Sequence, residues 1–534
     1  MTVRLWAAGA SFVALAAAMP AYAQSSSGGG KRVDVVPYLG VDQVVMAPLK
    51  GDGDVLTYTN VTAGVTAQVQ NRRVEAAVDL QYNHSFGWGS QAFDQDVISG
   101  IATANFNVAR GLSLHTGGLA TRIRTDGLSG ATPQRNSLSS QVWAGYVGPS
   151  YTTQLGDFNV NASYRLGYAR VNDDADGDFA GAQPSGSFAD SWTHSVMGSI
   201  GFSPDTVLPG VGLTASAGYD REDASQLDQR FEDVWGRVDA TVPVTSSLAL
   251  VGGVGYEKIE ISQRSPELDG NGVPLIRNGR YVTDDSSPRA LIYEFDDIIW
   301  DAGVLWRPSR RTTLQARVGE RYGGMTYQGS FLWEGRNSNV AIIIFDGIDS
   351  FGRMINGNVA ALSGNNFDVA RNPFTGDLTG CAFSTTGGGQ CFNDSLSGIT
   401  DANFRYRGVT AQYALKHGAW GWGVGAGYSQ RKFITPSGQT VLIRGSRDEN
   451  WFGNASMTYT ISNSDSIDLV GYANYFDASG GRPDVLNYGV FTSYFKNVSR
   501  RLSASASLGL DGVQADDLET IISAMGQVGL RYSF

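Results

Sequence analysis

Four histidines, His84, His115, His194 and His417, are the residues best suited to acid–base chemistry in this 534-residue chain. They are scattered, and the chain contains neither the G-x-S-x-G motif of serine hydrolases nor the H-E-x-x-H motif of zinc proteases. His115 or His194 could face a serine, but sequence spacing does not bring either pair together, and lone polar residues on strands are more often structural. The sequence therefore predicts no catalytic residues and no enzyme.

Two further patterns bear on metal binding. Residues 172–178, NDDADGD, open like a calcium loop, but Gln183 stands where the bidentate glutamate should be, which favours a solvated acidic loop; Ca²⁺ bridging to lipid phosphates is the alternative. Cys381 and Cys391 lie ten residues apart among Gly, Ser and Thr. In an exported chain this pair favours a disulfide, because a metal site needs more ligands than the neighbourhood offers. We expect no metal and no cofactor.

Charged residues recur on the polar face of alternating segments. The arginines are Arg165, Arg237, Arg317, Arg321 and Arg431, and the acidic counterparts are Glu75, Asp79, Asp239 and Asp468. Lining a lumen, such residues would tune ion selectivity. Pairing between neighbouring strands is the simpler explanation of the same pattern.

Strands must position these side chains. Segments 57–70, 74–83, 159–168, 420–429 and 502–511 alternate apolar and polar residues with a period of two, which is typical of strands and not of helices. In a barrel that spans a membrane, the apolar face meets lipid and the polar face lines the lumen.

The connections between strands alternate in length. The short ones fall near residues 71–73, 110–111, 156–157, 204–209, 245–246, 308–311, 336–339, 417–418, 463–464 and 497–500. The long, polar ones fall at 86–94, 125–137, 172–188, 263–289, 349–401, 434–447 and 477–484. Short periplasmic turns and long outer loops are typical of outer-membrane barrels. We predict an all-β fold: a single transmembrane, antiparallel, up-and-down β-barrel of about 22 strands, with 18 to 22 acceptable.

The two ends of the chain agree with export. Residues 1–23 have a charge at Arg4, an apolar run and an A-x-A site before Gln24, which predicts a cleaved signal peptide; a retained N-terminal helix is the alternative. Residues 24–32 are expected to be a flexible spacer and 33–534 the barrel, so no N-terminal plug is expected. The long outer loop 349–401 either folds into the pore or covers the surface. Glycines at 421–427 would widen a pore or let an inserted loop pack closely.

Composition narrows the partners. Charged residues make up 17% of the chain, aromatic residues 11%, and the formal net charge is −11. An acidic chain does not suit nucleic acid, and no segment after the signal offers the roughly 20 apolar residues of a membrane helix. The expected surroundings are outer-membrane lipids and lipopolysaccharide.

The C-terminal strand resembles the signal that the barrel-assembly machinery reads. Its residues are Gln527, Gly529, Tyr532 and the terminal Phe534. The resemblance implies a Gram-negative outer-membrane barrel that uses this machinery during insertion.

Two further resemblances are more local. Segment 308–350 resembles a repeated unit of outer-membrane barrels associated with exopolysaccharide and exosortase (PEP-CTERM) loci. The opening strands, 35–45 and 54–82, are similar to sphingomonad-type barrels that sometimes carry a preprotein translocase subunit label, although nothing here matches that small translocase subunit. A barrel of this size without a plug encloses a lumen wide enough for water, so we expect a channel or porin-like conduit, with export of surface polysaccharide, which the first resemblance implies, as one form. The alternative is an occluded structural or binding barrel whose outer loops contact lipopolysaccharide, exopolysaccharide or a partner protein.

Overall fold

The computed structural model describes residues 32–534 apart from 52–53, 90–93, 125–138, 174–188, 205, 278–279, 363–366, 385–388, 397–398, 435–446, 479–483 and 517–518. The expected signal peptide, nearly all of the spacer 24–32 and most of the acidic loop that begins at Asn172 lie outside these residues.

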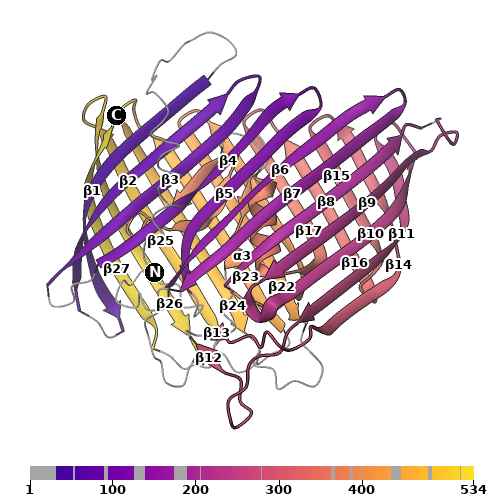
Figure 1. The fold of residues 1–534 in the computed structure, drawn as a ribbon. Coiled ribbons are helices and arrows are strands. Elements are labelled where there is room, and N and C mark those ends of the chain that lie inside the picture. Colours follow the sequence, from indigo (N-terminus) through magenta and orange to yellow (C-terminus); the bar gives the residue numbers. More distant parts are fainter. Residues whose placement is uncertain are drawn as a thin grey trace.

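A single sheet of 22 antiparallel strands closes into a barrel, in which each strand pairs with its neighbours in the chain (Figure 1). The strands are β1 (Arg32–Lys50), β2 (Leu56–Gln70), β3 (Val74–Trp88), β4 (Asp94–Ala109), β5 (Leu112–Arg124), β6 (Ser139–Leu155), β7 (Phe158–Asp173), β8 (Asp190–Phe202), β9 (Gly212–Ala224), β10 (Gln229–Pro243), β11 (Leu248–Gln263), β14 (Ala290–Ser309), β15 (Thr312–Arg321), β16 (Gly324–Glu334), β17 (Ser338–Asp349), β21 (Phe404–His417), β22 (Trp420–Phe433), β23 (Arg447–Thr460), β24 (Asp465–Ala478), β25 (Val485–Asn497), β26 (Leu502–Ala515) and β27 (Ile521–Ser533). The barrel closes where β27 pairs with β1, with Tyr38 opposite Ser533.

The alternation of side chains along each strand sorts them between two surroundings. On β27, the side chains of Val528 and Leu530, which point to one face of the sheet, are 63% and 55% exposed. The side chain of Gln527, which points to the other face, is 8% exposed. Exposed apolar side chains on the outer face of a closed barrel are stable only against lipid, because water would have to order around them. Among the described residues, no helix is long and apolar enough to span a membrane.

The connections separate by length between the two ends of the barrel. The ten expected short turns all lie at the end that carries the C terminus, at the top of Figure 1. Asn71 shows how such a turn closes, since its side chain accepts hydrogen bonds from the backbone N–H groups of Arg73 and Val74. The opposite end, called the loop end, carries the long connections. It also has four shorter connections that the pattern missed: 51–55, 225–228, 322–323 and 516–520.

Two smaller groups of elements lie within the long connections. β12 (Ile276–Arg277) and β13 (Arg280–Tyr281) form a hairpin between β11 and β14, and η2 (Gln226–Asp228) joins β9 to β10. The connection between β17 and β21 contains α2 (Phe351–Ala361), β18 (Asp368–Arg371), β19 (Leu378–Phe383), β20 (Gln390–Cys391) and α3 (Asn393–Leu396). This connection lies inside the barrel. The interior is therefore not the unobstructed lumen of a plug-free barrel.

Candidate functional site: a plug inside the barrel

The described residues of 350–403 fold into the barrel, and we call them the internal plug; Figure 1 shows α3 and its neighbours enclosed by the strands. α2 packs against β5–β8, and β19 packs against β21–β23. Strands β9 to β17 separate these two parts of the wall in one direction, and β24 to β4 separate them in the other. The internal plug therefore crosses the lumen from one side of the ring to the other. Of the two outcomes left open for the loop 349–401, the structure shows the inserted one.

The first contact with the wall is apolar and made by α2. Ser350 begins the helix, because its hydroxyl accepts a hydrogen bond from the backbone N–H of Arg353 at 3.2 Å. One face of α2 is completely buried, and its residues Phe351, Ile355 and Val359 join wall residues of β3–β7 in one cluster. Burial of each such side chain contributes about 1.5–3 kcal/mol. α2 is thus an anchor that holds the internal plug against the wall.

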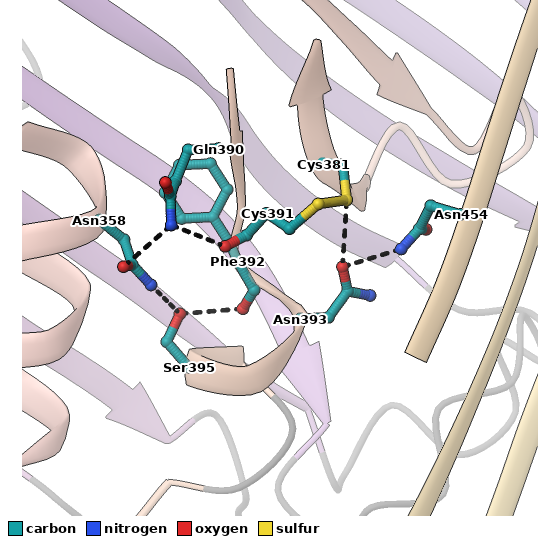
Figure 2. The surroundings of a disulfide bond; sticks show 8 residues. All are labelled: Asn358, Cys381, Gln390, Cys391, Phe392, Asn393, Ser395 and Asn454. Carbon is teal, nitrogen blue, oxygen red and sulfur yellow. Dashed lines mark hydrogen bonds between the residues drawn. A yellow bond between two sulfur atoms is a disulfide. The ribbon is translucent and has the colours of Figure 1, made fainter. Parts of the chain in front are cut away.

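The second contact with the wall centres on a disulfide. Cys381 of β19 and Cys391 of β20 are bonded, which confirms the disulfide that the sequence predicts. We call β19 and β20 together the disulfide element. Figure 2 shows that Gln390 of β20 donates a hydrogen bond to Asn358 of α2 at 3.1 Å, which joins the disulfide element to the helix. The disulfide and α2 therefore belong to one folded unit.

The wall beside the disulfide is made of small residues. A side-chain carbon at Gly425 of β22 would lie 2.8 Å from the Cys391 sulfur and 3.0 Å from the Cys381 sulfur, and one at Gly423 would lie 2.6 Å from the Phe383 ring. On β23, Asn454 donates a hydrogen bond to Asn393 at 2.9 Å (Figure 2). The glycines at 423 and 425 therefore allow the internal plug to pack closely, which is one of the two uses expected of the 421–427 face.

The third contact with the wall is a turn, residues 371–377, which we call the tip. Its Phe374 side chain is fully buried and meets the Phe491 ring edge-on, with ring centroids 5.7 Å apart. Gly509 leaves room for that ring, because a side-chain carbon at 509 would lie 2.7 Å from it. The Phe374 carbonyl accepts hydrogen bonds from the Tyr58 hydroxyl at 3.3 Å and the Asn60 amide at 2.9 Å.

A second carbonyl of the tip is bound in the same manner. The Gly376 carbonyl accepts hydrogen bonds from the Ser99 hydroxyl at 2.7 Å and the Gln81 amide at 3.0 Å. Gly376 has a φ of +75°, and a side-chain carbon there would collide with Asn83, so only glycine fits this position. Two carbonyls of the tip are therefore bound by side chains of the wall.

Two ion pairs flank the tip, with the charges reversed between them. Arg371 of the tip pairs with Asp79 of β3 at 2.5 Å, and Asp377 of the tip pairs with Arg122 of β5 at 2.8 Å. All four side chains are less than a third exposed, so these pairs are screened less than pairs on an open surface. We call the wall residues that hold the tip the tip socket: Tyr58, Asn60, Asp79, Gln81, Ser99, Arg122, Phe491 and Gly509.

The end of the internal plug carries a titratable group. Burial raises the pKa of Asp401 to about 6. Burial and the charge of Asp401 together raise the pKa of Tyr281 in β13 to about 12. Arg280, the neighbour of Tyr281, donates a hydrogen bond to the Val171 carbonyl of β7 at 3.2 Å. The β12–β13 hairpin therefore reaches over the loop end of the barrel toward the internal plug.

The lumen-facing arginines expected from the sequence fall in separate places. Arg237 and Arg317 form a four-membered network with Asp239 and Asp301, in which the ion pairs measure 2.6–2.8 Å. This network spans β10, β14 and β15 on a part of the wall that α2 and β19 do not cover. It borders a small recess that Arg321, Thr326 and Gln328 also line.

The other three arginines lie elsewhere along the wall. Arg321 pairs with Glu257, and Arg431 pairs with Asp448 at 3.4 Å and is almost fully buried. Arg165 lies 5.5 Å from the centre of the Tyr146 ring. Of the acidic counterparts, Asp239 belongs to the network and Asp79 to the tip socket, while Glu75 lies on β3 and Asp468 on β24.

The histidines do not assemble a hydrolase site in the part of the chain that the structure describes. His115 contacts the Ser113 hydroxyl at 2.8 Å, two residues away on the same strand, and His194 contacts Tyr164 at 2.9 Å. No carboxylate is bonded to either histidine in these contacts. Within the same residues, no cluster of three or more potential metal ligands occurs.

Sequence reasoning missed the tip and its socket. The segment Asn372-Pro373-Phe374-Thr375-Gly376 has the composition of a turn, which could have indicated a tight loop. Nothing local, however, relates it to Tyr58 or Asn60, which lie more than 300 residues earlier in the chain.

Comparison with known proteins identifies no family, since no protein-family model and no curated protein matches the chain. Solved structures do match. The ferric-catecholate import receptor Fiu from E. coli K12, in its open form, aligns at 10% identity over 96% of this chain and 84% of its own, with a TM-score of 0.44. The copper transporter OprC aligns at 10% identity over 96% and 82%, with a TM-score of 0.42. The siderophore receptor PirA from Acinetobacter baumannii aligns at 8% identity over 94% and 80%, with a TM-score of 0.38.

The structure corrects the expected fold class. The sequence predicts a barrel with no N-terminal plug and sets it apart from TonB-dependent transporters, which have such a plug and about as many strands. The barrel of this chain has 22 strands, and the described residues of 350–403 cross its lumen. A plug-free barrel is therefore the wrong description. The protein is an outer-membrane β-barrel whose described obstruction is an internal segment between β17 and β21.

Proposed function

We propose that this protein is a gated outer-membrane conduit that the internal plug closes. The proposal is supported chiefly by how the plug is attached. α2, the disulfide element and the tip touch the wall through side chains and, at the tip, through two backbone carbonyls, and none of them contributes a strand to the 22-stranded sheet. The plug can therefore leave without breaking a strand pairing of the barrel.

The position of the plug's two ends suggests the direction of opening. β17 ends at Asp349 and β21 begins at Phe404, and both positions are at the loop end. A segment attached only there swings toward the outer surface. The Arg237–Asp301 network beside it has two positive and two negative members, so we expect an opened conduit to take hydrophilic solutes with weak preference for either charge. Export of surface polysaccharide is a narrower form of this proposal.

The second candidate is an occluded binding barrel, whose loops contact lipopolysaccharide, exopolysaccharide or a partner protein. The observation that favours it is that the plug crosses the full lumen. The two candidates differ in whether the lumen conducts once the plug is gone.

Single-channel conductance in planar bilayers tests the proposal. The mature chain, residues 24–534, is compared with a variant that lacks 355–398, and each is first shown to be folded by heat-modifiable mobility in gel electrophoresis. We expect the deletion variant to fold, because no strand of the 22-stranded sheet is lost, and to give large, stable steps where the intact chain gives few or none.

A matched control replaces residues 269–273, the end of the outer hairpin, by Asn-Gly between Leu268 and Pro274, which are already bridged, and so keeps Arg280 and Tyr281. This control shortens the loop end but keeps the plug, so it should behave as the intact chain does. Silence from a folded 355–398 deletion would refute the conduit and leave the binding barrel.

A further inference from the structure

The tip is held in the lumen as a bound peptide is held in a receptor. Its backbone is recognised at two carbonyls, its one large apolar side chain fills a closed pocket, and its two ends meet charges of opposite sign. We propose that the tip socket is a ligand-binding site for a short peptide turn that carries an aromatic side chain between a cation and an anion, and that the internal plug occupies this site as an internal ligand.

The socket belongs to the wall and not to the plug. Its polar members lie on β2–β5, and its apolar members lie on β25 and β26, all of which are fixed by pairing on both sides. The site therefore persists when the tip leaves, with its donors still aligned. A preformed site of this kind binds with little cost of reorganisation.

The groups in the socket define the chemistry of the ligand. Tyr58, Asn60, Gln81 and Ser99 each donate a hydrogen bond to a tip carbonyl. The two carbonyls lie on either side of Thr375, and the φ of +75° at Gly376 belongs to a turn and not to an extended strand. Asp79 then selects a cation at the first end of the turn, and Arg122 selects an anion at the second.

The aromatic pocket adds selectivity for ring size. Phe374 is enclosed by Val44, Met46, Leu56 and Met525 besides Tyr58 and Phe491. Gly509 sets the depth, since any side chain there would enter the space of the ring. A planar ring fits this pocket, whereas a small side chain would leave a cavity.

The socket can be approached from outside the cell. Tyr58 and Asn60 lie within the first five residues of β2, next to the β1–β2 connection at the loop end. A ligand arriving from the loop end meets the socket before it meets the half of the lumen that lies nearer the short turns. Because the tip is covalently attached to the barrel, its effective concentration at the socket is on the order of millimolar. A free peptide therefore competes poorly with the tip for the socket.

The test removes the tip and supplies it again as a free peptide. Arg371 pairs with Leu378 across the β18–β19 hairpin through the backbone, so residues 372–377 can be replaced by Asn-Gly, a two-residue hairpin turn, within the otherwise full chain. Arg371 is changed to alanine in the same variant, because its side chain would otherwise still occupy Asp79. Binding of a fluorescein-labelled, capped peptide of sequence RNPFTGD is then measured by fluorescence anisotropy in detergent.

We expect the tip-replaced protein to bind the labelled peptide at least tenfold more tightly than the intact protein does. Two matched peptides serve as controls: one with alanine in place of phenylalanine, and one with the same residues in scrambled order. Each should bind the tip-replaced protein at least tenfold more weakly. In that protein, Asp79→Asn should weaken binding of the original peptide but not of a version with glutamine in place of its arginine.

Several results would overturn the inference. It fails if the folded, tip-replaced protein binds the peptide no better than the intact protein, or binds the alanine peptide equally well. If the replacement does not fold, Phe374→Ala and the milder Phe374→Leu take its place. The affinity for the labelled peptide is then expected to be lowest in the intact protein, higher in Phe374→Leu and highest in Phe374→Ala. Because the readout is peptide binding and not current, its failure is distinct from the failure of the conduit proposal.

Discussion

Substitution of Gly425 by alanine should loosen the internal plug while leaving the barrel intact. The added carbon would lie 2.8 Å from the Cys391 sulfur and 3.0 Å from the Cys381 sulfur, both closer than a side-chain carbon is normally found. The sulfurs cannot move aside independently, because each is covalently held by the other and both cysteines are buried. The clash must therefore be relieved by moving the disulfide element away from β22.

The magnitude follows from two opposing effects. Overpacking a well-filled site costs about 1–3 kcal/mol. Replacing glycine by alanine inside a strand returns about 0.5–1 kcal/mol by restricting the unfolded chain. The stabilisation from the restricted unfolded chain applies to the barrel as a whole, whereas the overpacking applies only to the docked plug. The free energy of docking therefore weakens by about 1–3 kcal/mol. This shifts the equilibrium from docked to released plug by roughly 5- to 150-fold.

Gly421 on the same face of β22 provides the control. A side-chain carbon there would lie 3.8 Å from Thr458, which is an ordinary contact, and would not meet the internal plug. Single-channel open probability of Gly425→Ala should exceed that of the intact protein, while Gly421→Ala should match it. Equal open probability for all three proteins, with folding shown by heat-modifiable mobility, would refute the steric argument.

Three further predictions concern the plug and the lumen. Replacing Cys381 and Cys391 by alanine removes the closure of a short loop, worth up to about 3 kcal/mol, so proteolysis within the plug should become faster while the heat-modifiable mobility of the barrel stays unchanged; equal proteolysis rates would contradict this. Because the pKa of Asp401 is raised to about 6 in the docked plug, docking is strongest below about pH 4 and weakens as the pH rises through 6. Open probability should therefore be higher at pH 7.5 than at pH 4.5, and Asp401→Asn should reduce that difference, the remainder coming from Asp349 at the loop end, whose pKa burial also raises to about 6; a pH response of undiminished size in the variant would exclude the Asp401 carboxyl as a source. In the 355–398 deletion, Arg317→Gln leaves the network with more negative than positive charge, so reversal potentials in a salt gradient should move toward cation selectivity, and an unchanged potential would show that the network does not line the conducting path.

The wall of the barrel could be predicted from the sequence because its signal is local. A strand that meets lipid on one face and the lumen on the other must alternate, as Val528 and Gln527 do, and each tight turn must carry residues such as Asn71 or Gly418. The four connections that were missed, such as Tyr322-Gly323, are short although they lie at the loop end, so the length rule could not indicate them.

The candidate site could be predicted only in part. The spacing of Cys381 and Cys391 indicated the disulfide, and the length of 349–401 marked it as a segment able to enter the pore. The tip socket could not be predicted, because Tyr58, Asp79 and Arg122 lie some 250 to 320 residues from the tip and carry no motif of their own. The arginines were expected as free lumen charges or as strand pairs, and Arg237 and Arg317 are found in a four-membered network that no pairwise pattern could indicate.

The sequence by itself determined the outer wall, its membrane-facing side and the segregation of short and long connections, because each follows from neighbours along one strand or across one turn. The tertiary structure decided whether the lumen is open. The sequence predicts no N-terminal plug and leaves the loop 349–401 either in the pore or on the surface. A barrel without a plug is the wrong description, since closure depends on α2, the disulfide element and the tip meeting wall residues that only the closed ring brings together. Contacts between segments so far apart in the chain leave no periodicity to read, and their energy exists only once the barrel has formed.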